Sequence, residues 1–298
     1  SRSLAPAQLV FNGRALGGMG TLPFTVTTSN GLGAAVSVQG AITHALREII
    51  ERDVVSCIEL LSSHIQDNQI HRLARSMGIE LDSGQFRDNL KYVLRVDPAT
   101  LPEPAAGLVD RVMSAGLTIE IKALPNDFGV PCFAVATAQD VGSSRVLSTA
   151  GYAAGYPLSG ALVRALLEVC QSRATHFQGG REDDSVVREK RLHEVVDEQG
   201  WLFNTRLPSL RFDVLEAYFL PGDDSFACYA ERATAVGLGA PHVFVRWPYP
   251  GICVARVLVP GVETWHATAG ESRLGTRMLK AQRDSRAWMC RPRQGSGT

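Results

Sequence analysis

The chain has 298 residues, 45% of them hydrophobic, and its 30 basic and 30 acidic residues give a formal net charge of zero at pH 7. A chain of this size and composition buries a full core, as one large domain or as two smaller ones. The balanced charge and the lack of a Lys/Arg-rich run exclude the electrostatic footprint of a nucleic-acid-binding protein.

The six cysteines are scattered through the sequence, and no two have the short spacing of a zinc site. Four of them, Cys57, Cys132, Cys170 and Cys253, lie in apolar runs, which favours buried free thiols over a disulfide framework. The start of the chain lacks the apolar stretch of a signal peptide, and no run has the length of a membrane span. We therefore expect a cytoplasmic protein that does not bind membranes.

Patterns of hydrophobic, glycine and proline residues predict a mixed α/β order along the chain. A short strand and a loop within residues 1–28 lead into a glycine motif at 29–35. Helices are expected at about 40–63, 70–78, 109–115, 161–173, 188–198 and 224–237. Strands are expected at 92–96, 117–124, 130–138, 214–220, 243–247 and 252–261, and a polar, flexible tail at 281–298.

The helix predicted at about 40–63 has two different faces. An α-helix turns by about 100° per residue, so residues three and four apart share a face. One face carries apolar side chains and is expected to enter the core: Ile42, Leu46, Ile49 and Ile50. The other face carries charge: His44, Glu48, Glu51 and Arg52.

A second helix, Ala161 to Arg173, follows the same pattern, Ala-x-x-(His/Arg)-Ala-Leu-x-Glu-x-x-(Glu/Gln). Each helix is preceded by glycines, at 31 and 33 and at 151 and 155. We interpret this as an internal duplication within a single domain of residues 1–298, with halves at about 24–145 and 146–265. The alternative is chance, since Ala, Leu and Glu are the commonest helix formers.

Glu48 and Glu51 lie on one helical face and repel each other unless a positive charge is near. Arg52 alone could form a surface ion network with them, which contributes little to stability. Alternatively these acids, with Glu168 and Gln171 of the second helix, are oxygen ligands for Mg²⁺, and arginines hold the phosphates that it bridges. The helices alone leave both interpretations open. His44 is either a hydrogen-bonded structural group or a catalytic one, and neither the P-loop nor the dinucleotide fingerprint occurs.

At these residues the sequence resembles the YcaO family of ATP-dependent enzymes that activate the peptide backbone. The similar segments run in the family's order from about residue 24 to 264. They are Ser29-Asn30-Gly31-Leu32, Glu48-Ile49-Ile50-Glu51-Arg52-Asp53, Arg164 to Arg173, Gly180-Arg181-Glu182-Asp183-Asp184 and Val259-Pro260-Gly261-Val262-Glu263.

The resemblance implies an α/β fold with an internal pseudo-repeat and a site for ATP and Mg²⁺. It assigns residues to that site by position only. The magnesium ligands would be Glu48, Glu51, Glu168 and Gln171, and the groups near the phosphates or the nucleotide would be Ser29, Asn30, Arg52, Arg173 and Arg181. Glu48, Glu51, Glu168 and Arg181 would take part in catalysis.

The activity implied is phosphorylation of a backbone amide oxygen in a ribosomally made precursor peptide, giving a thiazoline or oxazoline ring or a thioamide. The chain ends without the Pro-x-Pro-x-Pro tail common in azoline-forming cyclodehydratases, which favours the thioamide. Expected partners are the precursor peptide and a leader-peptide-binding or sulfur-delivering, TfuA-like protein, and a homodimer is left open. The alternative function is a non-catalytic nucleotide-binding scaffold for a partner enzyme.

Overall fold

The computed structural model describes residues 29–62, 93–142, 145–178, 190–191, 201–203, 205, 209–263 and 277. The described helices are α2 (Val38–Ser62), α4 (Ala105–Ser114), α5 (Leu158–Gln178), α7 (Phe226–Ala235) and two 3-10 helices, Pro98–Thr100 and Phe212–Tyr218. The described strands are β1 (Leu32–Ala35), β2 (Leu94–Val96), β3 (Thr118–Ala123), β4 (Cys132–Gly142), β5 (Arg145–Ala154), β6 (Lys190–Arg191), β7 (Ser209–Leu210), β8 (His242–Tyr249) and β9 (Ile252–Leu258). This mixed order confirms the predicted fold class.

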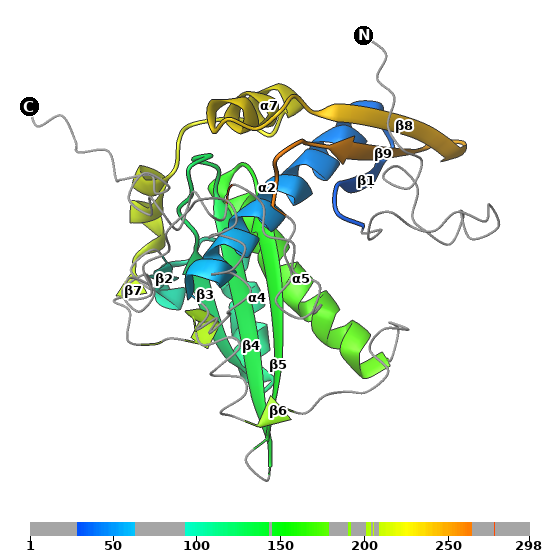
Figure 1. Ribbon diagram of the computed structural model, residues 1–298. Helices are drawn as coiled ribbons and strands as arrows, with labels where there is room; N and C mark the ends of the chain where they lie inside the picture. Colours follow the sequence, from blue (N-terminus) through cyan, green and yellow to red (C-terminus); the bar gives the residue numbers. More distant parts are fainter. Residues whose placement is uncertain are drawn as a thin grey trace, which may run out of the picture.

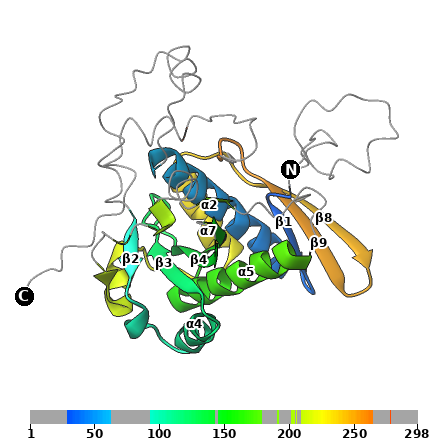
Figure 2. The ribbon, with the colours of Figure 1, turned by 90° about the horizontal axis from the view of Figure 1, so that it is seen from below.

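The larger sheet has six strands in the order β6-β5-β4-β3-β2-β7, and only β2 and β7 pair in parallel. Helix α2 covers one face of this sheet, and α4 and α5 cover the other (Figures 1 and 2). Among the described residues, β6 pairs with β5 only at Arg145 and Val146. In the part of the chain that the structure describes, the rest of β5 is therefore an edge of the sheet, between the layers of α2 and α5.

The smaller sheet has the order β1-β9-β8, and its strands pair antiparallel. The first half of α2 packs against β1 and β9, so this one helix belongs to both packing units (Figure 1). Gly33 of β1 allows this close contact, because a Cβ atom there would lie 2.1 Å from the carbonyl oxygen of Ala41.

The predicted core face of α2 is confirmed. Leu46, Ile49 and Ile50 are buried in a core that also includes residues of β4, β5, α7 and β9, and Ile42 packs against it while partly exposed. The helix itself is close to its predicted extent. The internal duplication stays a prediction, since among the described elements α5 packs on the six-stranded sheet alone, whereas α2 packs on both sheets.

Two predictions of secondary structure are wrong. Residues 214–220 were expected as a strand, but Phe212–Tyr218 forms a 3-10 helix. Leu215 is the buried residue of this helix, and the backbone N–H of Phe219 donates to the carbonyl oxygen of Glu216, three residues earlier, as in a 3-10 turn. The helix expected at 188–198 is wrong at Lys190–Arg191, the only part described, because these residues form β6.

Strand β5 was absent from the prediction, where Gly151 and Gly155 were treated as an approach to the second helix. Pairing with β4 along nearly its whole length fixes it as a strand. Gly151 is needed at this position, because a Cβ atom there would lie 2.3 Å from the backbone nitrogen of Val169 in α5.

The prediction of buried thiols holds for Cys57, Cys132 and Cys253 and is wrong for Cys170, which α5 exposes. Within the described ranges, no helix combines the length and the apolar character needed to cross a bilayer. The strand and loop expected in residues 1–28, the helix at 70–78 and the tail at 281–298 lie outside the described residues.

Candidate active site

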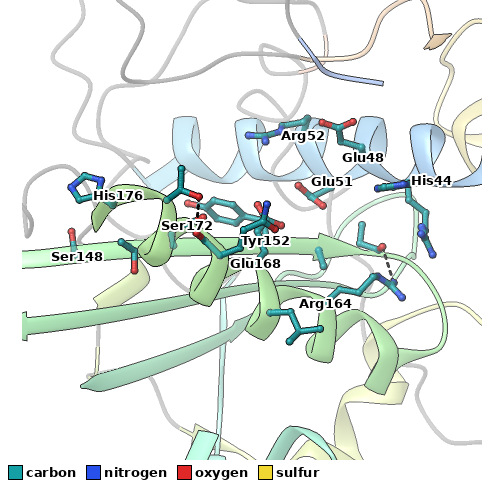
Figure 3. Close-up of a pocket in the computed structure, with 18 residues that line it drawn as sticks. His44, Glu48, Glu51, Arg52, Ser148, Tyr152, Arg164, Glu168, Ser172 and His176 are labelled. Atoms are coloured by element: carbon teal, nitrogen blue, oxygen red, sulfur yellow. Dashed lines mark hydrogen bonds between the residues drawn. The ribbon is translucent and has the colours of Figure 1, made fainter. Parts of the chain in front are cut away.

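A cavity of about 740 Å³ lies along β5, between α2 and α5. Its volume is in the range of small-molecule sites, which measure roughly 300–1,000 Å³. Side chains from both helices and from β5 point into it (Figure 3). The cavity contains the whole charged face predicted for α2: His44, Glu48, Glu51 and Arg52.

Three carboxylates from the two helices share this cavity. Glu48 and Glu51 come from α2, Glu168 comes from α5, and Gln171 lies one turn after Glu168. Burial and the neighbouring Glu168 carboxylate raise the pKa of Glu51 well above its ordinary value, although Arg52 and Arg164 act in the opposite direction. Burial is the larger cause, so the ionised form of Glu51 is costly in this cavity.

Glu48 is held in place by the glycine motif. The backbone N–H of Gly31 donates a hydrogen bond to Glu48 Oε2, at 3.1 Å. Burial raises the pKa of Glu48, and Arg52 and this hydrogen bond partly offset the effect. Gly31 has φ of +77°, and a Cβ atom there would lie 2.4 Å from the carbonyl oxygen of Val257. Only glycine fits at this position.

Ser29 and Asn30 precede Gly31 and do not line the cavity. In this structure the contribution of their motif to the site is indirect, through the Gly31 amide. The assignment of both side chains to the nucleotide stays a prediction.

The predicted arginines fall into three groups. Arg52 lines the cavity. Arg173 does not: its Nη2 donates to Gln139 Oε1 on β4, and its guanidinium lies 4.9 Å from the centroid of the Phe177 ring. Arg181 lies outside the described residues. Arg173 is about 140° around the helix from Glu168, which accounts for its direction.

Two further arginines, Arg47 and Arg164, line the cavity and were not assigned to the site from the sequence. Arg164 stands four residues before Glu168 on α5, so helical spacing alone could have identified it. Arg47 Nη1 forms an ion pair with Asp224, at 2.8 Å, and Asp224 also accepts a hydrogen bond from the Tyr229 hydroxyl, at 2.6 Å.

His44 lies beside these two arginines at the cavity wall. Partial burial lowers its pKa, and the positive charges of Arg47 and Arg164 lower it further. The structure places His44 in the cavity lining, and this position is compatible with both the structural and the catalytic role considered for it from the sequence.

Asp53, the residue after Arg52, anchors α2 from its other side. Its side chain is fully buried, and Oδ2 accepts a hydrogen bond from the backbone of Glu263, at 2.9 Å. Arg277 pairs with Asp53 and with Asp127, each at 2.8 Å. Burial raises the pKa of Asp53, and the Arg277 charge opposes that shift. Two of the segments singled out in the sequence, 48–53 and 259–263, therefore meet in space.

The donor set suits a magnesium–nucleotide site rather than a closed metal cage. Among the described residues, no three His, Cys, Asp or Glu side chains are close enough together to hold a metal ion by themselves. Mg²⁺ typically takes one or two carboxylates, several waters and the phosphates of its substrate. The half-buried, mutually repelling acids Glu51 and Glu168 fit that role, because a divalent cation between them would remove the repulsion.

Comparison with known proteins identifies relatives of this chain. The model of a family described as YcaO cyclodehydratase, binding ATP and Mg²⁺, matches residues 1–263. A protein of Rhizobium leguminosarum bv. trifolii, described as an uncharacterized protein in the tfuA 3′ region, is 26% identical over 252 residues. That match covers 79% of this chain and 52% of the relative, so the chain spans about half the length of this protein.

Two solved structures share the fold. A heterocyclase in complex with substrate and cofactor superposes with a TM-score of 0.62 at 20% identity, covering 90% of this chain and 32% of that one. YcaO from Methanopyrus kandleri, bound with AMPPCP and Mg²⁺, superposes with a TM-score of 0.56 at 18% identity, covering 86% and 61% of the two chains. At these identities the likeness concerns the fold alone.

Proposed function

Since this chain belongs to the YcaO family, we propose that it uses ATP and Mg²⁺ to activate a backbone amide of a ribosomally made precursor peptide. The observation that carries the proposal is the cavity in which glutamates and arginines from α2 and α5 converge. Phosphoryl transfer needs little covalent chemistry from a protein. It depends on positioning and on neutralising the charge that develops.

The residues of the cavity divide this work between them. Glu48, Glu51, Glu168 and the amide of Gln171 would supply one or two direct ligands to Mg²⁺ and hydrogen-bond to its waters, and the phosphates would supply the rest. Bound Mg²⁺ would neutralise phosphate charge. Arg52 lies on the same face of α2 and is available to the phosphates. The Gly31 amide would keep the Glu48 carboxylate oriented before the nucleotide binds.

The proposed reaction solves a leaving-group problem. A nucleophile that adds to a peptide carbonyl is normally expelled again, because the amide oxygen is a poor leaving group. Transfer of the γ-phosphoryl group to that oxygen forms an O–P bond, breaks the bond to ADP and lets the oxygen depart as phosphate. The attacking atom then keeps its bond to the former carbonyl carbon.

We infer that the nucleophile is an external sulfide, which gives a thioamide. The supporting observation is the relative described by its position in the tfuA 3′ region, which favours a TfuA-like sulfur-delivering partner. The second candidate is a Cys, Ser or Thr side chain of the peptide, which gives an azoline. The fold shared with a heterocyclase supports this candidate.

A non-catalytic scaffold explains the cavity less well. Burial and like charge make Glu51 costly in its ionised form. Such cost is typical of sites where a cation or a reaction requires the charge. A protein that only recruits a partner would gain nothing from placing three carboxylates in one half-buried cavity.

The experiment is ATP hydrolysis by the purified chain with Mg²⁺, with and without a precursor peptide encoded nearby and a sulfide source, with the peptide mass read from the same samples. Thioamide formation adds the mass of sulfur minus that of oxygen, and azoline formation removes one water. Glu168→Gln is the inactive control. A folded sample that neither binds nor hydrolyses ATP would reject the proposal in favour of the scaffold.

A further inference from the structure

Two arginine side chains meet at one end of the cavity, around Gly155. A Cβ atom on Gly155 would lie 2.7 Å from Arg47 Cδ and 3.0 Å from Arg164 Nη2. Gly155 has φ of +122°, so the chain turns here without a side chain that would push the two arginines apart. The arginines come from different helices, α2 and α5, and reach the same point.

The positive charge at this end exceeds the negative charge. Arg47 pairs with Asp224, whose side chain is 42% exposed and also accepts the Tyr229 hydroxyl. Arg164 donates Nη2 to the carbonyl oxygen of Ala154, at 3.1 Å, and forms no ion pair with any residue in the described part of the chain. Two guanidinium groups therefore share one half-exposed carboxylate.

The cavity changes its chemistry from one end to the other. Strand β5 and helix α5 run in opposite directions, so Ser148 and Thr149 lie near Thr175 and His176, whereas Ala154 lies near Arg164. Figure 3 shows this order, with Ser148 and His176 at one end, Glu51 and Glu168 in the middle, and Arg164 and His44 at the other end. The hydroxyl groups of Ser148, Thr149 and Thr175 are therefore followed by the carboxylates and then by the arginines.

This order matches a magnesium–nucleoside triphosphate in one direction only. A nucleoside is neutral and rich in hydrogen-bonding groups, the cation between the phosphates needs the carboxylates, and the terminal phosphate carries the most negative charge. Arg164 stands about 6 Å along the helix axis from Glu168, since four residues rise 1.5 Å each. That is close enough for one ligand to touch both.

We propose that Arg47 and Arg164 form a subsite for the terminal phosphoryl group of ATP, on the side of the carboxylates away from the nucleoside. The inference rests on the proposed function, because it assumes that the cavity takes a magnesium–nucleotide. Arg164 is the principal ligand, since its planar guanidinium can donate two parallel hydrogen bonds to phosphate oxygens. Arg47 adds charge while Asp224 fixes its position.

The test compares Mg·ADP with Mg·AMPPCP, which has a third phosphate but is not hydrolysed, by calorimetric titration of the full chain. Arg164→Gln should weaken AMPPCP binding about 10- to 100-fold, the range for a hydrogen bond between charged groups, and ADP binding by less than about threefold. Arg164→Lys should fall between, because it keeps the charge and loses the planar pair of donors.

Arg111→Gln is the matched control, because Arg111 is an exposed arginine on α4, outside the cavity. The melting temperature of each ligand-free variant verifies folding. Equal losses for both nucleotides, or no loss, in a folded Arg164→Gln variant would overturn this subsite while leaving the proposed function intact. If the wild-type chain binds neither nucleotide, the proposed function fails and the subsite fails with it.

Discussion

Replacing Glu168 by Gln separates two effects of the Glu51–Glu168 pair: its destabilisation of the ligand-free protein and its proposed role in binding Mg²⁺. In the ligand-free protein, Glu168 raises the pKa of Glu51 by electrostatic repulsion. Removing one negative charge while keeping the size of the side chain should leave the melting temperature unchanged or higher. The same change should abolish tight binding of Mg·nucleotide, because it removes a proposed metal ligand.

The size of the effect follows from linkage. At a ligand concentration of 100 times Kd, binding adds about 2.7 kcal/mol to the free energy of unfolding. For a domain of this size that raises the melting temperature by roughly 5–10 °C. Loss of an outer-shell partner of a metal typically costs about 10–100-fold in affinity, and loss of a direct ligand at least as much. At the upper figure, ligand stabilisation in the variant falls to about 0.4 kcal/mol, or about 1 °C.

The assay is thermal unfolding with and without Mg·AMPPCP, in wild type, Glu168→Gln, Glu51→Gln and the control Glu231→Gln. Glu231 is exposed on α7, away from the cavity, so its variant should match wild type in both conditions. A wild-type ligand shift in both cavity variants would refute the magnesium assignment. A ligand-free melting temperature several degrees below wild type would refute the argument that the acids repel.

Three further changes test the fold that holds the site. Leu46→Ala, at a fully buried position on α2, should destabilise by roughly 2–5 kcal/mol in denaturant unfolding, and an unchanged midpoint would refute the assigned core face. Gly33→Ala should cost about 1–3 kcal/mol or more, because its methyl group would collide with the α2 backbone; an unperturbed variant would contradict that packing. Glu120→Gln should cost about 3–5 kcal/mol, because it deprives the fully buried Lys122 of its carboxylate at 3.0 Å, whereas Lys122→Met should be nearly neutral. Burial lowers the pKa of Lys122, so the unfolded chain binds the Lys122 proton more tightly than the folded chain does. The free energy of unfolding of the wild type should therefore increase as the pH rises toward about 10.4, the ordinary pKa of lysine. Lys122→Met should lack this increase.

The sequence was most informative where helical periodicity and charge agree. In α2 the apolar residues fill the core and the charged ones line the cavity, so the position of Glu48, Glu51 and Arg52 followed from a turn of about 100° per residue. Glu168 and Gln171 followed from the similarity between the two helices. The structure brings together this part of the predicted site: Glu48, Glu51, Arg52, Glu168 and Gln171.

Other parts of the site depend on tertiary contacts that no local pattern encodes. Strand β5 is rich in small residues, and it is a strand because β4 pairs with it and because Gly151 lets α5 approach its backbone. Without β5 in the prediction, the cavity had no floor. The convergence of Arg47 and Arg164 was equally hidden, since the two residues are brought together only by the turn at Gly155.

The backbone of Gly31 links the smaller sheet to a carboxylate of the cavity. Its carbonyl oxygen accepts a hydrogen bond from the Val257 amide of β9, at 2.8 Å, while its own N–H holds Glu48. The position of the Glu48 carboxylate therefore depends on β9, a strand with no residue in the cavity lining. A docked protein or a remote substitution that bends the β8–β9 hairpin would therefore shift Glu48, a proposed metal ligand, through two hydrogen bonds: Val257 to Gly31 and Gly31 to Glu48. Loss of turnover in a β9 variant is then no sign that the altered residue touches substrate.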